Sequence, residues 1–336
     1  MPEISKTILT GDRPTGALHI GHYFGSLQNR LQLEQSYRTF IIIADIQALT
    51  DNWDETNKVS NAVLEVATDN LALGLDTDKT TIFIQSQIPQ IAELTVLFSN
   101  LVTVNRLKRN PTIKTEIEQK KNKFGESGES VTFGFLGYPV SQAADITVVR
   151  ANLVPVGIDQ MPVIEQGIEI IEKFNRLYNT EVFPKFEGQL SQAPKILGLD
   201  GNAKMSKSLN NCIYLKDSEI DTIAKIKLAK TDSGNTLTFE PETRPEISNL
   251  ILLYSLVNDL SIKDAVSDLA GINYGSFKQK LGLDMNNYFR EFRQRRSELA
   301  DKPKFVREIL ETGRLRVLIE AEKTMQMVRN AMGIEY

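Results

Sequence analysis

Short apolar segments alternate with amphipathic helical segments near the start of this 336-residue chain. Residues 7–10, 39–44 and 80–84 have the composition of buried strands, and residues 19–34 and 55–73 have helical spacing between them. Apolar strands separated by helices indicate βαβ units, which build a parallel sheet. We therefore predict an α/β fold with a Rossmann-like nucleotide-binding domain.

The carboxyl ends of the predicted strands are the places to search for a ligand site, because α/β sheets bind ligands beyond those ends. Residues 11–21 and 45–51 follow the first two strands. The basic and then Gly/Ser/Glu-rich stretch at 104–136 predicts a mobile insertion. Beyond residue 215 the pattern is helical almost throughout, which predicts a smaller all-helical domain.

Charge and composition narrow the class of protein. The net charge of −4, from 39 basic and 43 acidic residues, is not that of a protein coated by nucleic acid, so any polyanion must bind to local patches. Apolar runs such as 40–44 are too short for a membrane span, and residues 1–6 lack a signal-peptide pattern. The single cysteine, Cys212, excludes an internal disulfide. We expect a cytoplasmic protein without a membrane partner.

Residues 11–22, Gly-Asp-Arg-Pro-Thr-Gly-Ala-Leu-His-Ile-Gly-His, connect the first strand to the first helix. Gly21 would let a ligand approach the helix backbone closely, and free amides at a helix start favour phosphate. His19 and His22 are three residues apart and share a helix face. The alternative interpretation is a capped surface helix with incidental histidines.

A second motif, Ala-Lys-Met-Ser-Lys-Ser, occupies residues 203–208. Lys204 and Lys207 are suited to a flexible phosphate clamp, because a lysine point charge can follow the charge that develops on a leaving pyrophosphate. Taken alone, the motif could also be a solvated basic loop.

Together the two motifs resemble the HIGH and KMSKS motifs of class I aminoacyl-tRNA synthetases, letter for letter and in the same order. The resemblance implies that the histidines contact the phosphates of ATP, bound with Mg²⁺, and that the lysines stabilise pyrophosphate as it leaves. A substrate carboxylate is already a nucleophile, so positioning and electrostatics suffice for the reaction. No protein ligand to a metal is expected.

The whole chain is similar to the bacterial tryptophanyl branch of that family, from Gly11 to residues 325–333. Residues 45–50, 154–160 and 231–234 carry the same resemblance. It implies that the protein activates L-tryptophan to tryptophanyl-adenylate and then transfers it to tRNA(Trp).

The resemblance also implies roles for residues at matching positions. The catalytic set is His19, His22, Lys204 and Lys207. The ATP-binding set is Arg13, Pro14, Thr15, Gly21, His22, Gly157, Ile158, Asp159, Ile196, Lys204, Met205, Ser206, Lys207 and Ser208. The tryptophan-binding set is Gly11, Tyr138, Gln142, Asp145, Val154, Val156 and Gln160.

Within the tryptophan-binding set, Asp145 would accept the indole N–H, and Tyr138 and Gln160 would bind the substrate ammonium. Val154 and Val156 would form walls for the indole ring. Read without the resemblance, Asp145 could be a helix-terminal or salt-bridged aspartate, since an unpaired carboxylate among apolar neighbours is costly. Tyr138 could be a core residue and Gln160 a solvated one.

Two alternatives for function stay open. Many bacterial members of the tryptophanyl branch carry an apolar residue where Gln142 stands, and the Tyr138–Gln142–Asp145 spacing also resembles tyrosyl-tRNA synthetase. The chain could also be a synthetase-like paralogue that binds RNA or a protein without catalysis.

The resemblance implies a domain plan and partners. Residues 1–190 would form the catalytic domain with an insertion at about 104–140, and 191–215 the KMSKS region. Residues 216–300 would form the domain that binds the tRNA anticodon, and 301–336 helices that pack back on the catalytic domain. A homodimer is implied. The basic runs at 105–109 and 290–296 are either tRNA contacts or solvated helix faces.

Overall fold

The computed structural model of this protein describes residues 6–125, 127–190, 196–201, 204–206 and 209–336. Within these residues its centre is a five-stranded parallel sheet with the order β3-β2-β1-β4-β5. The strands are β1 (Thr7–Asp12), β2 (Arg38–Ile43), β3 (Thr80–Ile84), β4 (Leu153–Val156) and β5 (Glu187–Leu190). The order reverses between β1 and β4, and ligands bind at such a switch point in α/β proteins. The predicted α/β fold is confirmed.

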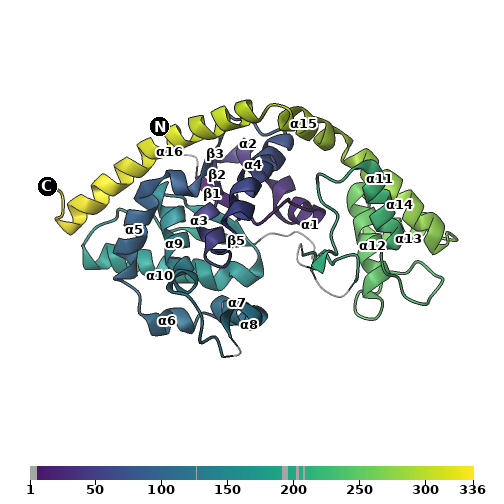
Figure 1. The fold of residues 1–336 in the computed structure, drawn as a ribbon, viewed down its shortest axis with the longest axis horizontal. Helices are drawn as coiled ribbons and strands as arrows, with labels where there is room; N and C mark the ends of the chain where they lie inside the picture. Colours follow the sequence, from purple (N-terminus) through teal and green to yellow (C-terminus); the bar gives the residue numbers. More distant parts are fainter. Residues whose placement is uncertain (1–5, 126, 191–195, 202–203, 207–208) are drawn as a thin grey trace.

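The apolar strands are buried on both faces of the sheet. In β2, Phe40 and Ile42 belong to one core cluster, while Ile41 and Ile43 belong to the other. All four side chains are at most 5% exposed. Successive side chains of a strand point to opposite faces, so a strand covered on both sides is apolar along its length. Helices provide that cover on both sides (Figure 1).

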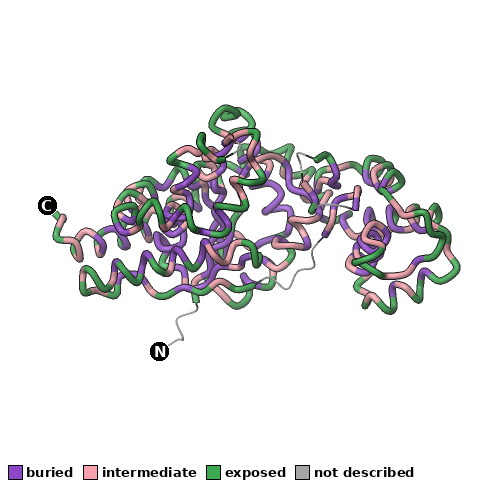
Figure 2. Tube along the Cα trace, turned by 90° about the horizontal axis from the view of Figure 1, so that it is seen from below, coloured by how far each residue is buried: buried purple, intermediate pink, exposed green. Residues whose placement is uncertain are grey.

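The helices of the body follow the strands in the order of a βα fold. Buried residues are concentrated in the interior of the body (Figure 2). Among the described residues they are α1 (Ile20–His22), α2 (Gln28–Ser36), α3 (Asp45–Leu49), α4 (Thr56–Ala72), α5 (Pro89–Ser99), α6 (Val104–Lys108), α7 (Pro111–Gln119), α8 (Lys121–Phe124), α9 (Phe133–Val148) and α10 (Met161–Leu177).

The first helical segment contains one wider turn. Sequence spacing predicts a helix over 19–34, whereas the structure places a π-helical turn, Tyr23–Leu27, between α1 and α2. This turn buries Phe24 and Leu27. Single π turns inside helices are frequent at functional sites, and this one directly follows the HIGH residues.

The predicted mobile insertion is wrong for residues 104–124, which form the packed helices α6, α7 and α8. Side chains of Thr103 and Asn110 accept backbone N–H groups at the starts of α6 and α7. Ile113 and Phe124 are fully buried. Capping and burial therefore order a segment whose composition is polar.

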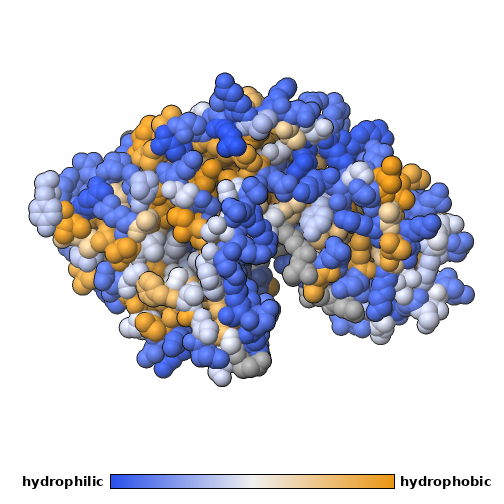
Figure 3. Space-filling model, viewed as in Figure 1, coloured by the Kyte–Doolittle hydropathy of each residue, from blue (hydrophilic) through white to orange (hydrophobic). Residues whose placement is uncertain are grey.

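The C-terminal helices form a separate lobe and then return to the body. They are α11 (Glu219–Leu228), α12 (Pro245–Val257), α13 (Ile262–Asp268), α14 (Tyr274–Tyr288), α15 (Arg290–Ala300) and α16 (Pro303–Met332). Helices α11 to α14 make up the lobe, and the space-filling view shows a cleft between it and the body (Figures 1 and 3). The Tyr23 ring lies 4.8 Å from that of Phe289 and 6.1 Å from that of Phe292, which joins the two parts.

Helix α16 crosses the body in contact with β3 (Figure 1). A Cβ atom placed on Gly313 would lie 1.9 Å from the carbonyl oxygen of Ile82 in β3. The helix backbone therefore lies directly against the strand backbone, which a residue with a side chain at position 313 would prevent.

Three arginines of the basic run in α15 make contacts within the protein, while Arg290 is exposed. Arg293 donates to Asn286 and Thr222, Arg295 donates to the backbone of α4, and Arg296 pairs with Asp69. These three arginines join helices of the protein to one another, and the tRNA contact of the run at 290–296 stays a prediction. The domain boundaries at 190, 215 and 300 stay predictions.

Candidate active site

The loop after β1 is fixed by a buried ion pair at the switch point. The Arg30 guanidinium donates to both carboxylate oxygens of Asp12, at 2.7 and 3.0 Å, and Asn70 donates to the same carboxylate at 3.1 Å. Burial favours the neutral acid, but the charge and hydrogen bonds of Arg30 hold the pKa of Asp12 below its usual range. Arg30 is fully buried, so the start of the HIGH loop is rigidly held.

His19 and His22 lie side by side at the start of α1. Their ring centroids are 3.8 Å apart, and the His19 backbone N–H points at Nδ1 of His22 at 3.3 Å. A Cβ atom on Gly21 would lie 2.9 Å from Nδ1 of His19. Glycine at this position therefore lets the His19 ring fold against the helix start.

The segment after the KMSKS motif pairs with the HIGH segment through the backbone. Ile20 N–H donates to the carbonyl of Ile213 at 3.0 Å, and Leu215 N–H donates to the carbonyl of Leu18 at 2.9 Å. Two motifs that are far apart in the sequence are therefore tied together by short antiparallel contacts.

The pairing also brings the backbone of Gly21 close to Met205 of the second motif. A Cβ atom on Gly21 would lie 3.5 Å from Cβ of Met205, which is itself buried. Burial of Met205 anchors the KMSKS segment, while Lys204 beside it is exposed. Lys207 and Ser208 lie outside the described residues, so their predicted roles stay predictions.

A buried carboxylate lies on α9. Asp145 is 3% exposed, and its two oxygens accept hydrogen bonds from Nε2 of Gln85 at 2.8 and 2.9 Å. Gln85 follows β3 and is held in turn by the backbone N–H of Gln47, at 2.9 Å from Oε1. Burial raises the pKa of Asp145 to about 7, the Gln85 hydrogen bond opposes the rise, and the charge of Asp45 adds to it. Asp145 is thus held by a neutral carboxamide instead of a cation.

Two further predicted groups belong to the core cluster that contains Ala144 and Ile146, the chain neighbours of Asp145. Tyr138 lies about two helical turns before Asp145 on α9, with its ring buried beside the Glu116 carboxyl of α7. Val154 and Val156 on β4 are buried in the same core cluster as Tyr138. An acid in apolar surroundings that include an aromatic ring suits a flat apolar ligand with one N–H or O–H donor.

A second charge cluster borders the HIGH loop. Asp51 follows α3 and is 9% exposed, and its carboxylate pairs with both Arg13 and Lys120. The Lys120 ammonium lies 2.5 Å from one Asp51 oxygen and 4.0 Å from the Glu116 carboxylate. Asp51 therefore ties the segment after α7 to the loop after β1.

A family model described as tRNA synthetases class I (W and Y) matches residues 3–290. The chain belongs to this family. A tryptophan–tRNA ligase from Lactococcus lactis is 45% identical over 342 residues, covering 98% of each protein. A tryptophan–tRNA ligase from Streptococcus pyogenes serotype M1 is 44% identical, again with 98% of each covered.

Solved structures give the same relationship. The tryptophanyl-tRNA synthetase of Campylobacter jejuni, complexed with ADP and tryptophan, superposes with a TM-score of 0.84 at 30% identity, covering 97% of this chain and 99% of that one. A tyrosyl-tRNA synthetase from Archaeoglobus fulgidus shares the fold, with a TM-score of 0.67 at 19% identity. The chain is thus a class I tRNA synthetase and an enzyme, as the two motifs predict.

Most predicted site residues of this class I synthetase lie at the carboxyl ends of β1 and β4. A Cβ atom on Gly11 would lie 2.3 Å from the carbonyl oxygen of Ile42, so the strand ends require glycine there. The Gly157 backbone lies against Asp159, and Ile196 is buried in the same core cluster as Met205. Pro14 is buried, Arg13 and Thr15 are half-buried, and Ser206 N–H donates to Asn211.

Three predicted residues have surroundings that bear on their roles. Ile158 is 72% exposed, and Gln160 donates to Asp159 at the protein surface. Gln142 is half-buried, and no described residue donates a hydrogen bond to its buried Oε1. The substrate contacts of these residues stay predictions.

Sequence reasoning missed Gln85, Lys120 and Glu116. Gln85 could have been found, because it is the first polar residue after the apolar strand 80–84, at the carboxyl end where ligands bind. Lys120 and Glu116 lie in the stretch taken as a mobile insertion, and only the tertiary fold brings them to the site.

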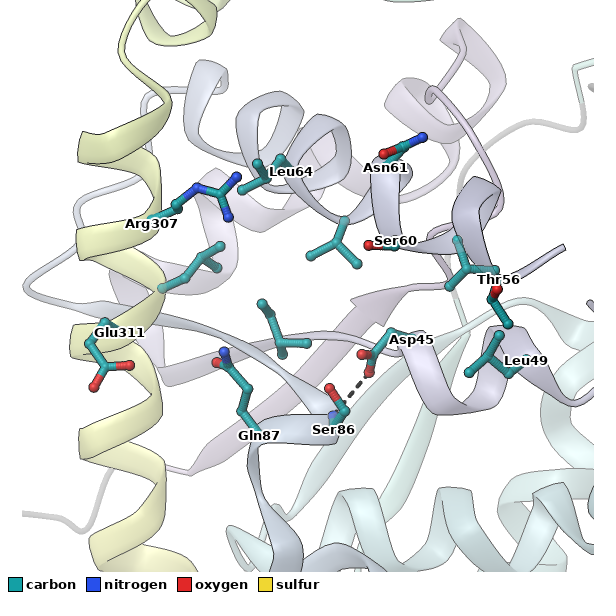
Figure 4. A pocket seen from close by; sticks show the side chains of 14 residues that line it. Asp45, Leu49, Thr56, Ser60, Asn61, Leu64, Ser86, Gln87, Arg307 and Glu311 are labelled. Carbon is teal, nitrogen blue, oxygen red and sulfur yellow. Dashed lines mark hydrogen bonds between the residues drawn. The ribbon is translucent and has the colours of Figure 1, made fainter. Parts of the chain in front are cut away.

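A separate cavity of about 740 Å³ lies behind the site, beyond the ends of β2 and β3 (Figure 4). Its wall includes Asp45, whose carboxylate accepts the Ser86 backbone N–H at 2.9 Å, and Arg307 of α16. None of the predicted site residues lines it. The motifs and the switch point predict the site of chemistry outside this cavity.

The raised pKa of Asp145 predicts pH-dependent amino-acid binding. If the carboxylate form accepts a donor from the substrate, the Kd for tryptophan should rise as pH falls below about 7. The ionised fraction falls about tenfold for each unit below the pKa, and the Kd should follow it. Isothermal titration calorimetry without ATP between pH 5.5 and 8.5 measures this.

Two variants test the assignment of this pH dependence. Asp145→Asn should make the Kd independent of pH. Gln85→Leu should move the midpoint to higher pH, because Gln85 lowers the pKa of Asp145. If the pH midpoint of tryptophan binding in both variants is the same as in the wild-type protein, a group other than Asp145 titrates.

Proposed function

We propose that this class I synthetase activates L-tryptophan with ATP and Mg²⁺ and transfers it to tRNA(Trp). The observation that carries the proposal is the backbone pairing between the segments of the two motifs, in which Ile20 N–H donates to the Ile213 carbonyl and Leu215 N–H donates to the Leu18 carbonyl, after β1. Tryptophan–tRNA ligases at 44–45% identity support the choice of amino acid.

The geometry suits adenylate formation. The tryptophan carboxylate attacks the α-phosphorus of ATP, the bond to the β-phosphate breaks, and pyrophosphate leaves. His19 and His22 would contact the phosphates at the helix start, where backbone N–H groups also favour anions. Lys204 and Lys207 would stabilise the charge that moves onto pyrophosphate. Mg²⁺ enters with the nucleotide as part of the substrate.

The amino acid would bind next to Asp145. The indole N–H donates to the carboxylate that Gln85 orients, and Val154 and Val156 lie beside the ring. The buried Oε1 of Gln142 would accept a hydrogen bond from the substrate ammonium. Without such a donor this oxygen would be a costly unpaired polar group. In this arrangement Gln142 is compatible with tryptophan.

Partners and location extend the proposal. We expect a homodimer that binds tRNA and acts in the cytoplasm. Among the described residues, no helix has the length and apolar character to cross a bilayer. Tyrosine is the competing substrate, because Asp145 could accept from a phenol, and the tyrosyl enzymes share the fold at 17–19% identity.

Pyrophosphate exchange with each of the twenty amino acids tests the function. We expect ATP–pyrophosphate exchange above background with tryptophan and no exchange with the other nineteen. Faster exchange with tyrosine would make this a tyrosyl enzyme. No exchange with any amino acid, by protein that binds ATP, would identify a non-catalytic paralogue.

A further inference from the structure

Asp69 of α4 connects α15 to the HIGH loop. Its side chain is fully buried, with one oxygen accepting from Nε of Arg296 at 2.6 Å. The other oxygen accepts from the backbone N–H of Leu18 at 3.3 Å, one residue before His19. A single carboxylate therefore joins an arginine of α15 to the backbone of the catalytic motif.

The Leu18 peptide is bonded on its other side to the second motif. Its carbonyl accepts from Leu215 N–H at 2.9 Å, and Ile213 accepts from Ile20 N–H at 3.0 Å. Asp69 and the segment after the KMSKS motif thus hold residues 18–20 from opposite sides. A displacement of Leu18 would change the spacing between the histidines and the KMSKS segment.

The Asp69 contact depends on Arg296. Burial raises the pKa of Asp69 to about 6, and the charge and hydrogen bond of Arg296 oppose that rise. A buried carboxylate that loses its partner becomes an uncompensated charge, which is strongly unfavourable. It would then protonate or move, and Leu18 would lose a charge-assisted acceptor.

Helix α15 is the element by which the lobe is attached to the body. Phe289, before its first residue, and Phe292 pack on Tyr23, and Arg293 bonds Asn286 and Thr222 of the lobe. One turn later Arg296 reaches Asp69. The position of the lobe is therefore linked to Leu18 through a short chain of buried contacts.

We propose that Asp69 and Arg296 are positioning residues for adenylate formation, a latch through which the lobe sets the spacing of the HIGH and KMSKS segments. The inference rests on the proposed function. It assigns Arg296 of α15 a role in the chemical step.

The test compares two neighbouring arginines of α15. Arg296→Gln should lower kcat of tryptophan-dependent exchange by about 10-fold to 100-fold, as expected for a small misplacement of reacting groups. The KM for tryptophan should stay within about twofold, because the amino-acid pocket is not part of the latch. Arg295→Gln is the matched control: Arg295 bonds the Ala72 carbonyl and does not contact Asp69 or Leu18, so its kcat should stay at the wild-type value.

Two more variants separate positioning from stability. Arg296→Lys restores a cation and should recover most of the lost kcat. Asp69→Asn should slow the reaction as Arg296→Gln does, and the double variant should be no slower than the slower single one, since both remove the same contact. If the Arg296→Gln variant does not fold, kcat of the isosteric Asp69→Asn variant is compared with that of Arg295→Gln instead.

Three outcomes would overturn the latch: Arg296→Gln with a lowered melting temperature but wild-type kcat, an equal loss in Arg295→Gln, or additive effects of Asp69 and Arg296. Failure of the proposed function looks different, because the wild-type protein itself would then show no exchange with tryptophan.

Discussion

The wild-type enzyme should activate tryptophan about 10⁴ times more efficiently than phenylalanine. Phenylalanine has no ring N–H to offer, so the buried Asp145 carboxylate would keep its Gln85 hydrogen bonds but lose the donor that the indole supplies. Tyrosine should be rejected by shape, because its smaller ring underfills the space beside Val154 and Val156. The kcat/KM values for ATP–pyrophosphate exchange with the three amino acids measure this.

Asp145→Asn is the control for that discrimination. It keeps the size of the side chain and removes the charge, which should cost about 1.5–3 kcal/mol of tryptophan recognition. The KM for ATP should not change. If wild-type enzyme discriminates against phenylalanine by less than about 100-fold, Asp145 does not hold the indole N–H.

Replacing Lys204 by alanine should reduce the rate of adenylate formation by about two to three orders of magnitude, the effect of losing one preorganised charge-stabilising group. Lys204 is exposed next to the anchored Met205, so it can reach a phosphate without disturbing the fold. Lys207→Ala should act similarly. Single-turnover formation of the adenylate gives the rate.

Lys216→Ala is the matched control for the clamp. Lys216 is also an exposed lysine near the lobe, and it pairs with Glu65 on α4. We expect its variant to keep the wild-type rate, and all three variants to keep the affinity for tryptophan. A Lys204→Ala rate within about twofold of wild type would remove this lysine from the mechanism.

Strands and motifs were predictable from the sequence because each carries its own local signal. Residues 40–44 are apolar because they lie in a sheet that is covered on both faces, and the HIGH and KMSKS letters predict a phosphate site. Strand β5 lacks such a signal: its residues, Glu187–Leu190, are mostly exposed, and only pairing with β4 identifies them as a strand.

The rest depends on contacts between distant segments. Arg296 looks like a solvated charge until the fold brings it to Asp69, more than two hundred residues earlier in the chain. Likewise, polar neighbours hide the burial of Ile113 and Phe124 in the segment 104–124. Gln85 shows no role until Asp145 lies opposite it. Charge and composition are properties of single residues, whereas these contacts are formed by pairs of residues that are distant in the sequence.

The close fit of Gly313 against Ile82 has a consequence for how the chain reaches its native state. β3 ends the sheet, so its outward N–H and C=O groups are open to pairing with another chain until something covers them. The cover is α16, which lies C-terminal to β3 in the chain and is therefore synthesised after it. A nascent or truncated chain without α16 would therefore expose an unpaired β-strand edge that can pair with another chain. Gly313→Val should displace α16 and promote aggregation during refolding through the same edge.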